Sequence, residues 1–156
     1  MSVSARYAHT NLVALDWRRL ASFYQDLFGC QPVGSRRHAR GAWVEELTSI
    51  EAAEVDGIHL RLPGFASDGP TLEIFQYSRH AEWHPPVLNQ PGFAHIAFEV
   101  DDVRQARQAA LDLGASEVGK VLTTDIPGAG TITVVYMADP EGNLFELQHW
   151  HGKKAT

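Results

Sequence analysis

The pattern of hydrophobic and polar positions predicts a strand followed by a helix at the start of the chain. Residues 6–14 alternate in the manner of a half-buried strand. Asp16 is a suitable N-cap for a helix, and Gly29 is suited to a helix end. Between them, apolar residues recur at helical spacing and form one face: Trp17, Leu20, Ala21, Tyr24, Leu27 and Phe28.

The rest of the first half is rich in strand patterns. Apolar and β-branched runs predict three strands, at 43–47, 58–62 and 71–77. Residues 32–40 contain Pro and Gly among several arginines, which favours a loop or an irregular strand. The segments 51–57 and 63–70 are expected to be connections. The order of elements in this half is therefore βαβββ.

The second half predicts the same order. A strand at 93–100 is followed by a helical stripe that begins after Asp101 or Asp102 and ends at Gly114. Three further strands are predicted, at 116–122, 131–138 and 143–150. Residues 139–143, Asp-Pro-Glu-Gly-Asn, form a strong turn signal between the last two strands. The βαβββ unit is thus present twice.

These elements predict one domain over residues 1–156. We expect an α+β fold built of two βαβββ modules, 6–77 and 93–150, joined by a linker at 78–92 that is rich in Pro. Two such modules would form a curved mixed sheet, a partly open barrel around a cleft.

One His and one Glu occupy matching positions in the two halves. His9 and His95 each stand in the first strand of a half, and Glu73 and Glu146 each stand among apolar residues of the last strand. A carboxylate within a half-buried strand is costly unless it is paired, hydrogen-bonded or coordinated. If the first and last strands both line the concave face, the four side chains converge. We therefore predict a metal site made of these four residues.

The donor types limit the kind of ion. Two imidazoles and two carboxylates suit one divalent ion, and Ni, Co, Zn, Mn and Fe all remain open. Six-coordination would leave two positions for water or for oxygens of a substrate. Several residues on the expected cleft face or near it are candidates for substrate contact: Trp43, His59, Arg61, Phe75 and Tyr77.

Composition excludes several functional classes. The 156-residue chain has a formal net charge of −6 and no block of Lys or Arg, which argues against a nucleic-acid surface. The single Cys30 cannot form an internal disulfide, in keeping with a reducing compartment. No apolar run is long enough for a membrane helix, and the first residues lack the pattern of a signal peptide. We expect a cytoplasmic protein with neither membrane nor nucleic-acid partners.

Several motifs resemble the vicinal oxygen chelate superfamily of glyoxalases, bleomycin resistance proteins and dioxygenases. The motifs are FYQDLFG at 23–29, LEI at 72–74, HIAFEVDD at 95–102, DPEGN at 139–143 and FEL at 145–147, together with His9-Thr10. They span nearly the whole chain. Members of this superfamily use paired βαβββ modules to hold a metal ion that chelates neighbouring oxygens of a substrate, and they are commonly homodimers.

The resemblance places His9, Glu73, His95 and Glu146 on the four ligand positions of the superfamily. A carboxylate at Glu73 is closest in pattern to glyoxalase I and to methylmalonyl-CoA epimerase. Bacterial glyoxalase I has an Arg four residues after its first ligand and an Asn four residues after its second, both used for glutathione. Here Val13 and Tyr77 stand at those positions, so the substrate is not expected to be linked to glutathione.

The resemblance implies a metal-dependent lyase or isomerase of the glyoxalase I type. Such an enzyme transfers a proton next to a carbonyl group, and the metal acts as a Lewis acid on an enediolate. Glu146 would be the base and Glu73 its mirror partner. Two alternatives stay open: an Fe(II) dioxygenase of the extradiol type that uses His9, His95 and Glu146, and a resistance protein that binds an antibiotic or other small molecule. We expect a homodimer that acts on a small molecule with vicinal oxygens.

Overall fold

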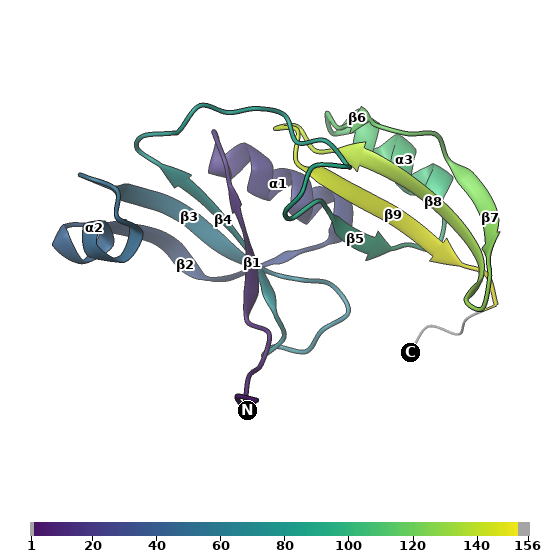
Figure 1. The fold of residues 1–156 in the computed structure, drawn as a ribbon, viewed down its shortest axis with the longest axis horizontal. Helices are drawn as coiled ribbons and strands as arrows, with labels where there is room; N and C mark the ends of the chain where they lie inside the picture. Colours follow the sequence, from purple (N-terminus) through teal and green to yellow (C-terminus); the bar gives the residue numbers. More distant parts are fainter. Residues whose placement is uncertain (1, 153–156) are drawn as a thin grey trace. The chain divides into compact units, whose positions relative to one another are not determined.

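The computed structural model describes residues 2–152, which form two compact units that meet in sequence between Trp83 and His84. The first unit contains β1 (His9–Val13), α1 (Trp17–Phe28), β2 (Gln31–Arg40), α2 (Ala42–Thr48), β3 (Glu54–Arg61) and β4 (Thr71–Tyr77). The second contains β5 (Ile96–Glu99), α3 (Val103–Asp112), β6 (Ser116–Glu117), β7 (Leu122–Ile126), β8 (Gly130–Ala138) and β9 (Leu144–Trp150). Figure 1 shows each unit as a mixed sheet with a helix against it.

The two sheets have matching topology. In the first unit the strand order is β1-β4-β3-β2, with β1 parallel to β4 and the other pairs antiparallel. In the second it is β5-β9-β8-β6, with β5 parallel to β9, and β7 also pairs with β8. The predicted α+β fold with two βαβββ-like modules is therefore confirmed.

One long helix covers one face of each sheet, and capping residues fix where it begins. Oδ1 of Asp16 accepts hydrogen bonds from the backbone N–H groups of Arg18 and Arg19, at 3.0 and 3.2 Å. Asp102 has the same role at the start of α3. Gly29 ends α1 in the left-handed conformation, with φ 68°, which costs Gly no steric strain. The capping predictions at Asp16, Asp102 and Gly29 are confirmed.

Alternation along the strands separates an apolar face from a mixed face. In β4, Leu72 and Ile74 are fully buried with Leu20 and Tyr24 of α1, whereas Glu73 between them points to the opposite face. In β9, Phe145 and Leu147 are fully buried, and α3 packs against β8 and β9. Each sheet thus buries one face under its helix and leaves the other face to carry its carboxylate.

Some predicted elements were wrong. Residues 43–47 were expected to be a strand and instead lie in α2, where Val44 alone is buried and packs with Ala53 and Val55. Only one of the seven residues of α2 is buried, which a surface helix allows, and Glu45, Glu46 and Leu47 all have good intrinsic helix propensity. For residues 32–40, by contrast, the irregular-strand alternative is confirmed, because they lie in β2, whose register shifts between Val33 and Arg37.

Two other boundaries differ from the predictions. The expected connection 51–57 ends early, because β3 already begins at Glu54. The expected strand 116–122 is divided into the short β6 and the separate β7, both of which pair with β8. No helix among the described residues is long and apolar enough to cross a membrane.

Candidate metal and proton-transfer site

In the first unit, Glu73 lies at the centre of a group of polar side chains on the face of the sheet opposite α1. Its Oε2 lies 3.4 Å from Nε2 of His9, and the same oxygen accepts a hydrogen bond from Nδ2 of Asn11 at 3.2 Å. Its Oε1 lies 2.9 Å from Nε2 of His59. The carboxylate is only 12% exposed, so these contacts replace most of its solvation.

In the second unit, Glu146 has a smaller set of partners. Its Oε2 lies 3.5 Å from Nε2 of His95. The phenol of Tyr136 donates a hydrogen bond to the carboxylate, and the rings of His95 and Tyr136 are 5.0 Å apart and edge-on. Glu146 is one of two charged residues in the buried set of the described chain; the other, Asp139, is held within its turn by Asn143.

Strand register makes the two groups equivalent. Glu73 is paired with Asn11 of the parallel strand, and Glu146 is paired with Ala97. In both units the His stands two residues before that partner, so His9 and His95 approach their carboxylates from the same direction. The sequence repeat is therefore also a structural repeat: in both units the same two atoms, Nε2 of the His and Oε2 of the Glu, are in contact.

The antiparallel neighbours of the carboxylates are also equivalent but differ in chemistry. Glu73 is directly paired with His59 in β3, and Glu146 is directly paired with Tyr136 in β8. His59 was predicted as a substrate contact, and the structure places it against Glu73. Tyr136 was missed, although the tight turn at 139–143 could have identified it. Counting back through that hairpin puts Tyr136 opposite Glu146.

The environment keeps His59 neutral and fixes its ring. Burial lowers the pKa of the His59 imidazole, the charge of Glu73 opposes that effect, and the charges of Arg37 and His9 lower the pKa further. Its Nδ1 lies 3.2 Å from Oγ1 of Thr71. With one ring nitrogen at Thr71 and the other at Glu73, His59 links a hydroxyl group to a carboxylate.

The phenol of Tyr136 is likewise held in its protonated form. Burial raises its pKa, and the hydrogen bond to Glu146 and the negative charge of that residue raise it further. A protonated phenol is a hydrogen-bond donor, so Tyr136 stabilises the ionised carboxylate.

The other predicted substrate residues of the sheet lie on β4, the strand of Glu73, and on the neighbouring β3. Phe75 is edge-on to His59, with ring centroids 5.7 Å apart, and its ring occupies the space above Gly57. Arg61 and Tyr77 are half-buried at the ends of β3 and β4. Their contact with a substrate stays a prediction.

Trp43 and Cys30 have different surroundings. Trp43 is 58% exposed on α2, next to Val44, whose cluster with Ala53 and Val55 also packs with Phe75 and Tyr77, and its contact with a substrate stays a prediction. Cys30 is fully buried, and burial raises the pKa of its thiol to about 11. It is therefore protonated at neutral pH and is not a nucleophile.

The donor chemistry of the two pairs fits a divalent ion, but each pair is only half of the predicted set. Two donors held about 2.1 Å from one ion lie about 3.0–3.4 Å apart, close to the Nε2–Oε2 separations of 3.4 and 3.5 Å. Within residues 2–152, no group of three or more His, Cys, Asp or Glu side chains is arranged to hold an ion by itself. The four-ligand site therefore stays a prediction that takes one pair from each unit.

Comparison with known families identifies the chain. Residues 6–147 match the Glyoxalase/Bleomycin resistance protein/Dioxygenase superfamily. The protein belongs to this superfamily, and the resemblance inferred from its motifs is confirmed at that level. No curated protein matches the chain by sequence.

Solved structures show the same fold at low sequence identity. A glyoxalase family protein from Bacillus cereus is 19% identical, with a TM-score of 0.75 and 97% of each chain covered. A glyoxylase/bleomycin resistance protein/dioxygenase domain from Frankia sp. is 17% identical, with a TM-score of 0.57 and coverage of 96% of this chain and 100% of that one.

A third similar structure contains ligands. It is a mutant of the genomically encoded fosfomycin resistance protein from Listeria monocytogenes, complexed with Mn(II) and 1S,2S-dihydroxypropylphosphonic acid. It is 14% identical, with a TM-score of 0.56 and 96% of each chain covered.

Proposed function

We propose that this superfamily member is a divalent-metal-dependent lyase or isomerase that transfers a proton next to a carbonyl group. The observation that carries the proposal is the matched pair of contacts, His9 with Glu73 and His95 with Glu146, at equivalent register positions of two similar sheets. The presence of Mn(II) in the related Listeria protein supports a divalent ion. A small molecule with vicinal oxygens is the proposed substrate, and a homodimer is the proposed assembly.

The proposed metal ligands are His9, Glu73, His95 and Glu146. A bound divalent ion would act as a Lewis acid and stabilise negative charge that develops on the substrate oxygens. Each imidazole presents Nε2 toward its carboxylate, which is the nitrogen that would bind the ion. The remaining chemistry, the removal and return of a proton, falls to the chain's own carboxylates.

The contacts support Glu146 rather than Glu73 as the base. Glu73 is held by three side chains, His9, His59 and Asn11, and both of its oxygens are engaged. Among the described residues, the polar partners of the Glu146 carboxylate are His95 and Tyr136. Because a base must move between its resting partners and the substrate carbon, the less restrained carboxylate is better suited to the task.

Metal content is the first test. Protein purified without chelator or added metal is expected to contain one divalent ion per site, and His95→Ala and His9→Ala are each expected to lose most of it. His151→Ala is a matched control, because the imidazole of His151 hydrogen-bonds Thr133 and His151 is not one of the proposed ligands. Full metal content in both ligand variants would contradict the four-ligand site.

Proton transfer is the second test. The metal-loaded protein, incubated in D₂O with a panel of α-hydroxy ketones and hemithioacetals of small thiols, is expected to exchange the proton next to the carbonyl, as followed by proton NMR. Glu146→Gln is expected to retain metal and to lose at least about 10²-fold in exchange rate. Oxygen uptake with catechols after anaerobic iron loading, without such exchange, would favour the dioxygenase alternative and overturn this proposal.

A further inference from the structure

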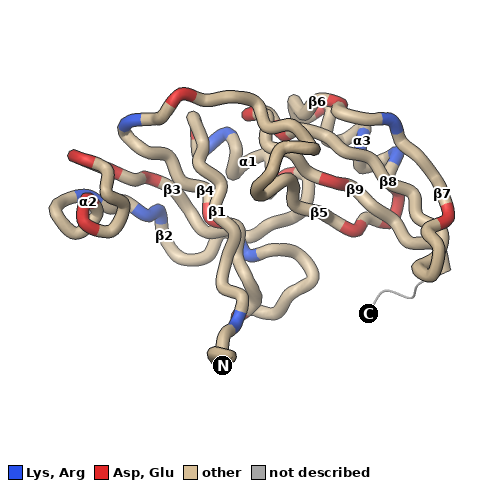
Figure 2. The backbone as a smooth tube through the Cα atoms, viewed as in Figure 1, with Lys and Arg blue, Asp and Glu red and all other residues tan. Residues whose placement is uncertain are grey.

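The basic residues of the second unit are concentrated in one place. Residues 84–152 contain nine acidic side chains but only three basic ones, Arg104, Arg107 and Lys120. All three line the same pocket, beside Glu117 and Val121. In Figure 2 the blue segments of this unit lie on α3 and on the connection between β6 and β7. Within residues 84–152, where acidic residues are in strong excess, every Lys and Arg side chain therefore lines one cavity.

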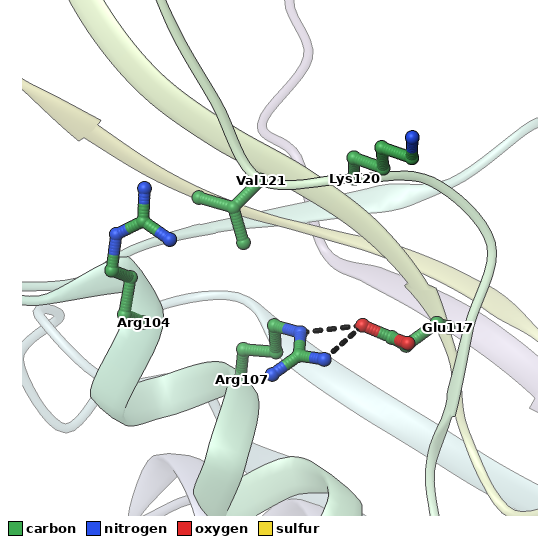
Figure 3. Close-up of a pocket in the computed structure, with 5 residues that line it drawn as sticks. All are labelled: Arg104, Arg107, Glu117, Lys120 and Val121. Carbon is green, nitrogen blue, oxygen red and sulfur yellow. Dashed lines mark hydrogen bonds and ion pairs between the residues drawn. The ribbon is translucent and has the colours of Figure 1, made fainter.

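The pocket is built from successive turns of α3 and from the segment that follows β6. Arg104 and Arg107 stand three residues apart on α3, so they share one face of the helix. Figure 3 shows Arg104 beside Val121 and Arg107 directed toward Glu117, with Lys120 on the segment that follows Glu117. The cavity has a volume of about 360 Å³, at the lower end of the range for small-molecule sites.

The guanidinium groups have different partners. Arg107 donates from Nε to Oε1 of Glu117 at 2.6 Å and also donates from Nη2 to that oxygen. This ion pair fixes Arg107 and leaves its remaining N–H groups for a ligand. Arg104 and Lys120 have no ion-pair partner among the described residues. Two of the three cations are therefore uncompensated.

Strand register places this pocket on the opposite face of the sheet from the candidate metal site. Glu117 is paired with Met137, which is paired with Phe145, and directly paired residues share a face. Met137 and Phe145 are fully buried on the side that α3 covers. Tyr136 and Glu146 alternate with them and point the other way. The pocket is thus separate from the carboxylate on which the proposed function depends.

We propose that the pocket formed by Arg104, Arg107, Glu117, Lys120 and Val121 binds the phosphate group of a small molecule. The planar guanidinium of Arg104 can donate two parallel hydrogen bonds to phosphate oxygens, which is the geometry that favours Arg at phosphate sites. Lys120 adds positive charge at the rim. The site's function does not rely on the proposed metal chemistry on the other face.

The test uses the full chain and two anions, pyrophosphate and ADP, at physiological salt. Titration followed by ¹H–¹⁵N NMR is expected to give saturable shifts confined to residues 103–108 and 116–122. Tighter binding of ADP than of pyrophosphate would assign the phosphate to a nucleotide, and equal binding would assign it to the phosphate group alone. The absence of saturable shifts for both anions would overturn the proposal.

Two variants with opposite expected effects sharpen the test. Arg104→Gln is expected to weaken pyrophosphate binding about tenfold, because it removes the unpaired guanidinium. Glu117→Gln is expected to strengthen binding several-fold, because it removes the competing carboxylate and frees Arg107. Arg40→Gln, which changes an exposed arginine of the first unit, is the control and should leave binding unchanged. Equal affinity in wild type and Arg104→Gln, with thermal unfolding showing both folded, would contradict a phosphate site here.

Discussion

Nε2 of His59 lies 2.9 Å from Oε1 of Glu73, in the strand position that Tyr136 occupies beside Glu146 in the second unit. The two units therefore use the same architecture with different donors: an imidazole holds one carboxylate and a phenol holds the other. This difference gives the two carboxylates different surroundings in an otherwise repeated frame. It also makes the roles of His59 and Tyr136 separately testable.

His59 is expected to act as a positioning residue for Glu73. Removing it in His59→Ala should lower the affinity for Zn²⁺ or Ni²⁺ by about 10-fold, because residues that orient a metal ligand typically contribute this much. His59→Gln, whose amide can still donate to Glu73, should retain most of the affinity. Isothermal titration calorimetry measures both. His38→Ala is the control, since His38 contacts Asp56 instead; the same affinity in His59→Ala as in that control would rule out the positioning role.

Tyr136→Phe tests the donor on the other carboxylate. Loss of the phenol should lower the free energy of unfolding by about 1–3 kcal/mol, because Glu146 is buried and loses a hydrogen bond to its charged form. In the wild type, the pKa of Tyr136 is raised above its ordinary value of 10.0. The residue therefore stabilises the fold fully below pH 10.0, and this contribution is lost as the pH rises through the pKa of the folded state.

Two measurements check this prediction. Ultraviolet titration of the wild type minus that of Tyr136→Phe isolates the phenol of Tyr136, and this difference should show ionisation above the ordinary value of 10.0. Urea unfolding gives the free-energy difference between the two proteins. Tyr7→Phe is the control, because Tyr7 is largely exposed and its phenol hydrogen-bonds Thr10 rather than a carboxylate. A difference curve that shows ionisation at or below pH 10.0 would contradict the raised pKa of Tyr136.

The ion pairs of Asp56 in the first unit predict that the stability of the protein falls at acidic pH. Burial alone would raise the pKa of Asp56, but hydrogen bonds and positive charge from Arg36 and His38 outweigh it and lower the pKa below 3.8. A carboxyl group whose pKa is lower in the folded state stabilises the fold at any pH above its pKa in the unfolded chain. That contribution is lost as the pH falls through the pKa of the folded state.

Asp56→Asn is therefore expected to destabilise the protein more at pH 7 than at pH 2. The difference should be below about 1 kcal/mol, because the group is partly exposed and solvent screens it. Urea unfolding of the wild type and the variant at both pH values measures it. A difference of the same size at pH 2 and pH 7 would show that the ion pairs with Arg36 and His38 are not its source.

Much of the fold and of the candidate site can be predicted from local sequence rules. The rest depends on how the strands pair. Asp16 and Gly29 define α1 by capping, and alternation around Glu73 predicts its face, because both rules concern adjacent residues. The contact between His59 and Glu73 requires the register of β3 against β4, which are joined by a nine-residue connection, 62–70, that leaves the register open. The helix at 43–47 was missed because its one buried residue, Val44, packs with Ala53 and Val55 after the helix, a contact that the local apolar pattern does not show.

Gly57 shows how closely the sheet is packed beside Glu73. A Cβ at this position would lie 2.1 Å from the backbone oxygen of Ile74 and 2.4 Å from Cδ1 of Phe75. The aromatic ring could move, but the backbone oxygen belongs to the paired strand and cannot yield without disturbing the ladder. Gly57→Ala is therefore expected to lower the free energy of unfolding by about 1–3 kcal/mol.

The matched control is Gly119→Ala, because a Cβ at Gly119 would meet no atom within 4 Å and its φ is not in the left-handed region. That variant should change the free energy of unfolding by less than about 0.5 kcal/mol. Urea unfolding measures both variants. If Gly57→Ala is as stable as Gly119→Ala, the ring of Phe75 and the backbone of β4 are not held against Gly57. His59, edge-on to Phe75, would then lack the rigid neighbour that keeps it against Glu73.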